Sequence, residues 1–103
     1  MRETDFQGIP NFNAPHEGPV TVGAAAQALK DLVTIHVDTK VVLIGVETAA
    51  VRFTVTGTTP TATLGFNAVA GASIRLTRQE ADAALFIRAT GTDAALQVAQ
   101  YKD

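Results

Sequence analysis

The side chains that could do chemistry are few and lie far apart in the sequence. The chain has two histidines, His16 and His36, no cysteine, and Ser73 as its single serine. A covalent hydrolase needs a nucleophile beside a base, and no G-x-S-x-G loop is present to supply one. Neither a Walker phosphate loop nor a dinucleotide-binding glycine pattern occurs. We therefore expect a protein that is not an enzyme and that binds no cofactor.

His36 and Asp38 come closest to a metal-binding pair. They alternate with three β-branched residues, which predicts a strand over 33–38 with both polar side chains on its solvent face. Structural zinc sites use four ligands, so a pair with no third partner favours an ordinary polar face. We expect no metal here. His16 lies in a proline-rich segment and is likewise expected to be solvated.

Charge and hydropathy exclude further classes of function. The chain has 8 Lys and Arg against 10 Asp and Glu, a formal net charge of -2. Such a balance gives no general attraction to a phosphate backbone, so we expect no nucleic acid partner. No stretch has the length and apolar character of a membrane span, and the segment that begins at Met1 lacks the apolar core of a signal peptide. We expect no membrane partner, and synthesis in a cytoplasm.

The strands determine where these side chains lie. The clearest strand pattern lies within residues 51–65, where a strand is followed by a turn. Apolar and polar residues alternate from Val51 to Thr56, which is the two-residue period of a strand with one buried face. We expect Phe53 to be buried between two sheets. Gly57 and Pro60 then predict a turn, because proline cannot donate to a ladder and glycine tolerates positive φ.

Other segments repeat this pattern. Residues 41–46 are a continuous apolar run, which predicts a strand covered on both faces. Residues 24–32 contain helix formers, but the missing cap favours a strand and a bend. Thr77 and Glu80 form a capping box that predicts a short helix over 78–84. The spacing of residues 85–101 predicts a hairpin.

Together these segments predict an all-β fold. Seven or eight short strands with turns about every eight to twelve residues are typical of an antiparallel β-sandwich or a jelly roll, with a compact barrel as the alternative. We expect one such domain over 20–103. The helical turn over 78–84 is its one other element of regular structure.

Residues 1–19 predict an extended N-terminal arm. They hold three of the four prolines, and Phe6, Ile9 and Phe12 recur at every third position. In a polyproline II conformation these three side chains share one side. The arm docks on a neighbouring chain through them, which we favour, folds back over its own sheet, or stays disordered.

Three arginines within predicted strands form a second candidate interface. Arg52, Arg75 and Arg88 each flank apolar residues. They could line one outer face as an ion-pairing stripe. Plain solvation is the alternative, and we favour it because exposed ion pairs contribute little.

A set of short phrases is spread over residues 52–98, a span of about half of the chain. They are Arg52–Thr54, Gly57–Thr61, Gly65, Ala70–Gly71, Ser73–Ile74, Phe86–Ala89 and Asp93–Val98. This pattern resembles small virion structural proteins of tailed bacteriophages. The resemblance implies a β-rich head decoration, cement or connector protein that resides in the virion and has no catalytic residues. It implies the major capsid protein or another virion protein as partner, and we expect a homo-oligomer.

The strand and turn from Phe53 to Thr61 also resemble chitobiase-type C-terminal β modules of carbohydrate-active enzymes. Those modules usually carry Asp before the glycine, where this chain has Thr56. A sugar-binding module also presents aromatic platforms, whereas this chain has no Trp and one Tyr, Tyr101. Carbohydrate binding is therefore our second expectation, and a tail or connector protein is a further alternative.

Overall fold

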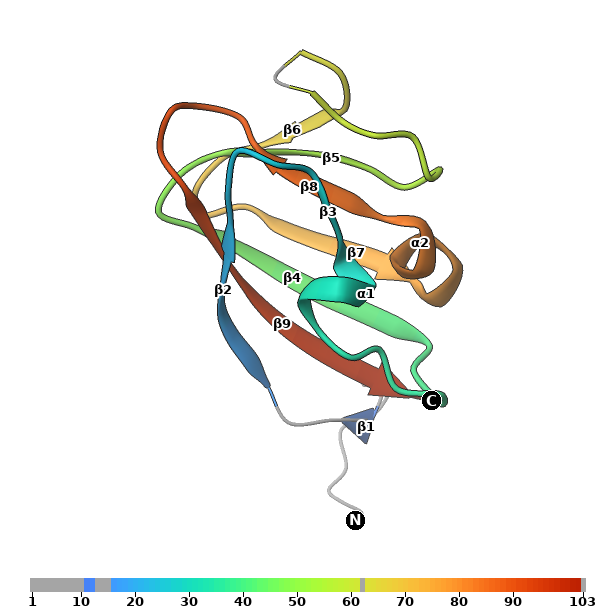
Figure 1. The fold of residues 1–103 in the computed structure, drawn as a ribbon. Helices are drawn as coiled ribbons and strands as arrows, with labels where there is room; N and C mark the ends of the chain where they lie inside the picture. The colour runs from blue at the N-terminus through green and yellow to red at the C-terminus, as the bar shows by residue number, and fades with distance from the viewer. Residues whose placement is uncertain (1–10, 13–15, 62, 103) are drawn as a thin grey trace.

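The computed structural model describes residues 11–12, 16–61 and 63–102, which form two antiparallel sheets packed as a sandwich (Figure 1). Within these residues the strands are β1 (Asn11–Phe12), β2 (Glu17–Val22), β3 (Gln27–Ala28), β4 (Val41–Glu47), β5 (Val51–Thr54), β6 (Phe66–Ala68), β7 (Ser73–Thr77), β8 (Leu85–Arg88) and β9 (Ala94–Lys102). Two short helices, α1 (Leu29–Leu32) and α2 (Arg78–Ala83), interrupt them. The predicted all-β sandwich is confirmed.

The strand order is that of a jelly roll. One sheet runs β2-β9-β4-β7, and β1 extends the β2 edge by pairing with the last residues of β9. The other sheet runs β3-β8-β5-β6. Strands β2 to β5 thus pair in turn with β9, β8, β7 and β6, as in one long hairpin whose tip is the β5–β6 connection. Rolling this hairpin brings β4 beside β9 and β5 beside β8, which closes the two sheets.

The core lies between the sheets and is lined by alternate residues of each strand. In β4, Val42, Ile44 and Val46 are buried, but Leu43 is 37% exposed. The prediction that residues 41–46 are covered on both faces is therefore wrong. Helices α1 and α2 bury their apolar residues Leu29 and Ala81 in the core between the sheets and not over the outer face of β4.

The predicted strand over 33–38 is wrong, because these residues form a loop that Gln100 of β9 fixes. The Gln100 side chain is 1% exposed. Its Oε1 accepts from the His36 N–H at 2.9 Å and the Thr39 hydroxyl at 2.8 Å, and its Nε2 donates to the Thr34 carbonyl at 2.7 Å. A side-chain amide thus replaces the ladder partner that a strand would need.

The predictions for the two segments that contain the helices had different outcomes. The capping box is present: the Glu80 N–H donates to Thr77 Oγ1 at 3.2 Å, and the Thr77 N–H donates to Glu80 Oε1 at 2.9 Å. Residues 24–32, predicted as a strand and a bend, do contain a bend at 24–25 and the short strand β3, but they end in one turn of helix, α1. This helix has no side-chain cap, but Leu29 is buried and its N–H donates to the Ala84 carbonyl at 2.9 Å.

The hairpin predicted over 85–101 does not form. Strand β8 belongs to the β3-β8-β5-β6 sheet, whereas β9 belongs to the other sheet. Residues 89–93 therefore cross between the sheets. Turn residues mark where a chain reverses but do not decide which sheet the next strand joins.

The sandwich begins before the predicted boundary at Val20. Strand β2 starts at Glu17, which lies opposite Val98, and β1 pairs Phe12 with Tyr101. The chain thus returns to its own sheet at Phe12, as in the alternative for the arm. Phe6 and Ile9 lie outside the described residues.

Three aromatic rings form a ladder across the core-facing side of one sheet. Phe53 lies opposite both Phe66 and Phe86, with ring centroids 5.7 Å and 5.5 Å away. Phe86 is fully buried and Phe66 is 65% exposed. Phe53 is half-buried rather than enclosed, because the sandwich opens towards β6.

Stability losses should follow burial along this ladder. We expect Phe86→Ala to lower the free energy of unfolding by about 3–5 kcal/mol, and Phe66→Ala by only about 0.5–1.5 kcal/mol, the value of an aromatic pair. Phe53→Ala should fall between them. Urea unfolding measures all three, with Phe86→Leu as the milder variant if Phe86→Ala does not fold. A loss at Phe66 equal to that at Phe86 would contradict the ladder.

Candidate interaction surface

The β5–β6 connection folds back onto its own domain and holds β6 in place. The Thr54 hydroxyl donates to the Thr58 carbonyl, the Gly57 N–H donates to the Ala83 carbonyl at 3.1 Å, and Pro60 is fully buried. Gly65 has a φ of 120°, and a Cβ there would lie 2.9 Å from the Phe53 carbonyl oxygen. Only glycine suits that position. The connection is thus an anchored turn next to β6.

Strand β6 and the residues that flank it carry a cluster of exposed apolar side chains. Leu64 is 49% exposed, Phe66 65% and Val69 58%. Five large apolar side chains of the described residues are exposed, and these three lie within six positions. We call β6 with these three residues the apolar edge, because β6 is the last strand of its sheet.

No charged residue occurs from Phe53 to Ile74, a run of 22 residues in a chain of which 17% is charged. The apolar edge lies within this run. This edge was not predicted from the sequence. The uncharged run was the signal that could have indicated it.

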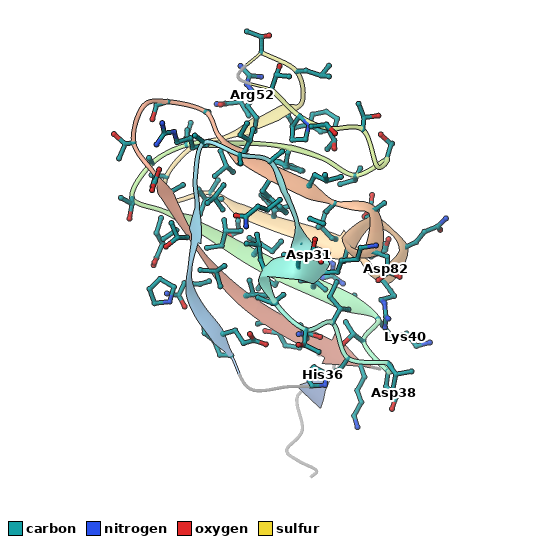
Figure 2. The ribbon with its side chains drawn as sticks, in the orientation of Figure 1. Asp31, His36, Asp38, Lys40, Arg52 and Asp82 are labelled. Atoms are coloured by element: carbon teal, nitrogen blue, oxygen red, sulfur yellow. The ribbon has the colours of Figure 1, made fainter. Side chains whose placement is uncertain are left out.

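The charge is distributed unevenly between the two ends of the sandwich. Figure 2 places five of its labelled residues near the helices and the end of β9, namely Asp31, His36, Asp38, Lys40 and Asp82, whereas Arg52 lies at the other end, in β5 beside β6. At the opposite end, four connections that cross between the sheets lie close together, namely 23–26, 48–50, 69–72 and 89–93 (Figure 1). Hydrogen bonds of 3.0 Å join Arg88 to Gly23 and Ala89 to Ala50.

These four connections, which we call the loop end, contain one charged residue, Asp93. Its Oδ1 lies 2.6 Å from Arg88 Nη1, so its charge is paired. Burying a surface without free charges carries a small desolvation penalty, and the centres of protein interfaces are depleted in charge. The loop end and the apolar edge, which meet at Val69, therefore form the candidate interaction surface.

The predicted arginine stripe is not present. Arg75 lies in β7, opposite Leu43, whereas Arg52 and Arg88 lie in the other sheet. Arg52 and Arg88 occupy successive rows of the β5–β8 ladder and therefore point to opposite faces. Arg52 Nη1 donates to the Gly65 carbonyl at 3.0 Å, a contact that helps to hold the β5–β6 connection. An interface role for each arginine singly stays a prediction.

The residues that follow the N-terminal segment are attached to the sheet. His16 Nε2 lies 2.6 Å from Gln97 Oε1, and Gln97 Nε2 donates to Glu47 Oε1 at 3.3 Å. His16 is exposed, as expected, but it is engaged with Gln97. These contacts fix where the chain enters β2. Of the three predicted arm residues, the structure therefore places only the backbone of Phe12.

The described residues contain no group of three or more His, Cys, Asp or Glu side chains that could hold a metal ion. His36 and Asp38 are both exposed, and Arg78 Nη1 donates to the His36 carbonyl at 2.7 Å. In the described part of the chain, no helix combines the length and hydropathy needed to cross a membrane. No protein-family model, curated protein or solved structure matches this chain.

The loop of His36 and Asp38 provides a test of the metal hypothesis. We expect His36→Ala and Asp38→Ala each to change the free energy of unfolding by no more than about 0.5 kcal/mol, since both side chains are exposed. Thr39→Val, the control in the same loop, should cost about 1 kcal/mol through its lost bond to Gln100. A thermal midpoint that falls on chelation with EDTA, and no longer does so in the two alanine variants, would establish a metal site.

Proposed function

We propose that this chain is a structural protein of a bacteriophage virion, specifically a capsid decoration or cement protein. It binds and stabilises the shell through its β domain and its N-terminal segment. The observation that carries the proposal is the surface of the apolar edge and loop end, whose one charged residue, Asp93, is paired with Arg88, because a decoration protein must bury part of its own surface on its neighbours. The resemblance described above supports the same function. The jelly roll supports it only by analogy, since this architecture serves both capsid and lectin domains.

In this function the domain and the N-terminal segment act as two linked contacts. Residues 1–10 precede β1, which pairs with the last residues of β9, whereas the apolar edge lies in the other sheet. Ten residues can extend about 35 Å, which is enough to reach a second shell protein. Linking the contacts raises the effective concentration of the weaker one, and binding only the assembled shell stabilises that state by mass action.

Residues 1–10 alone would bind weakly. Phe6 and Ile9 could each contribute about 1.5–3 kcal/mol when buried. Ordering the backbone costs about 1–2 kcal/mol for each residue fixed, which offsets most of that gain. The segment therefore needs the domain contact, and the pair of contacts favours binding on an assembled shell over binding to one free partner.

Carbohydrate binding is the second candidate, and Phe66 is the observation that favours it. Its ring is 65% exposed and rests beside Phe53, so one face could stack on a sugar. Titration with chitin and cellulose oligosaccharides tests this candidate. Saturable binding that Phe66→Ala abolishes would favour a carbohydrate module over a shell protein.

The proposal predicts where the protein resides. Intact particles of the phage that encodes this chain, purified by density gradient, should contain it in many copies by quantitative mass spectrometry. Adding the purified protein to particles that lack it should raise the temperature at which the shell ruptures. Its absence from the particles, together with its presence in the soluble fraction of infected cells, would overturn the proposal.

Removing residues 1–10 tests the N-terminal contact. A chain that begins at Asn11 keeps β1 and β2, so its circular dichroism spectrum and thermal midpoint should match those of the full chain. Its affinity for shells should fall at least about tenfold, which corresponds to about 1.4 kcal/mol. The full chain with Phe6→Ala and Ile9→Ala should show the same loss. Unchanged affinity in both variants would show that the domain alone binds.

A further inference from the structure

The free edges of the two sheets differ in how they are protected against pairing with another strand. Strand β7 carries the exposed Arg75, and β3 has only two residues. Strand β2 contains Pro19 and a register shift between Glu17 and Val20. Charges, proline, bulges and short length are the devices that keep edge strands apart. Strand β6 is also short, with three residues, but it has neither charge nor proline nor bulge, and it displays Phe66.

The surface around β6 is also compatible with a copy of itself. A surface with net charge repels an identical surface unless its charges alternate across the symmetry axis. The run from Phe53 to Ile74 has no charged residue, and Arg52 of β5, which lies beside Asn67, donates to the Gly65 carbonyl of its own chain, so two apolar edges can meet with little repulsion. An antiparallel strand pair is self-complementary, as a two-fold interface requires. A charged partner protein would find no counter-charge here.

We propose that the apolar edge is a contact between two copies of this chain, in which β6 pairs antiparallel with β6 of the second copy. The two-fold axis passes at Asn67, so Phe66 of each copy lies opposite Ala68 of the other. Two four-stranded sheets then become one continuous sheet of eight strands. Leu64 and Val69 flank this pairing, and the exposed face of Phe66 becomes covered. The contact leaves most of the loop end free for the shell.

The contact is small, which sets its strength. Strand β6 has three residues, so few backbone hydrogen bonds form, and the apolar edge supplies three large side chains. Stable interfaces bury about 800 Å² on each partner, and this contact falls below that size on its own. The association is therefore weak in dilute solution and strong where copies are held close together. The strong association of copies on a shell rests on the proposed function, whereas the pairing of β6 with β6 does not.

Cysteine cross-linking tests the contact on the full chain. The chain has no cysteine, so a single introduced thiol reports one position without background. Asn67 is exposed and would face its own copy across the axis, where opposed Cβ atoms lie about 4.5–5.5 Å apart. We expect Asn67→Cys to give a covalent dimer with an oxidant or a short bis-maleimide. The yield should be at least about tenfold above that of Val37→Cys, an exposed control outside the apolar edge.

A second substitution decides whether the dimer depends on the apolar edge. Phe66→Lys or Val69→Lys in the Asn67→Cys chain places like charges at the axis and should lower cross-linking about tenfold or more. Val37→Lys in the same chain should leave cross-linking unchanged. Circular dichroism checks that each variant folds, and either lysine variant suffices.

The inference is overturned if Asn67→Cys cross-links no better than Val37→Cys, or if neither lysine variant lowers its yield. It is also overturned if Asn67→Cys in purified particles links to a shell protein and not to a second copy. A cross-linked dimer of a chain that is absent from particles would refute the proposed function and leave the inference standing. If the chain is present in particles but Asn67→Cys gives no cross-linked dimer, the proposed function stands and the inference is overturned.

Discussion

The rest of the structure depends on β9, because three other strands and one long loop are fixed to it. Its nine residues pair with β1 and β2 on one side and with β4 on the other. Its inward residues Ala94, Leu96 and Val98 are buried, and Gln100 continues that row into the loop over 33–40. A backbone bond of 2.7 Å from Lys40 to the Tyr101 carbonyl then places the start of β4. The last strand of the chain thus determines where segments sixty residues earlier lie.

This dependence explains how much of the fold the sequence could predict. The capping box at Thr77 and the turn that begins at Gly57 involve residues within three or four positions, so local chemistry decides them. The loop over 33–40 is decided by Gln100, more than sixty positions away, and its alternating side chains mimic a strand. Distant residues also decide which sheet β8 and β9 join, because β8 pairs with β5 and β9 pairs with β4. The overall class was predictable because the count of short strands does not depend on their partners.

The candidate surface was less predictable than the fold, for a related reason. Arg52, Arg75 and Arg88 carry the chemistry that a sequence displays most openly, yet the pleat and the two sheets separate them. Leu64, Phe66 and Val69 read as ordinary core residues, and only the pairing of Phe66 with Phe53 at the sheet margin shows that Phe66 lacks a covering layer. Whether a side chain is exposed depends on how the whole chain folds. The uncharged run from 53 to 74 was the part of this surface that the sequence did contain.

The exposure of Phe66 has a physical cost that the fold could have avoided. The β5–β6 connection buries Pro60, and hydrogen bonds join it to Ala83 and Arg52. This connection directly precedes Phe66 but leaves its ring mostly exposed. Leaving an aromatic side chain mostly in water forgoes part of the roughly 1.5–3 kcal/mol that full burial provides. That loss matters in a domain of this size, whose total stability is typically about 5–15 kcal/mol. The anchored β5–β6 connection keeps the backbone of β6 ordered before any binding. In the proposed contact with a second copy, the Phe66 ring would therefore become buried without a large loss of backbone entropy.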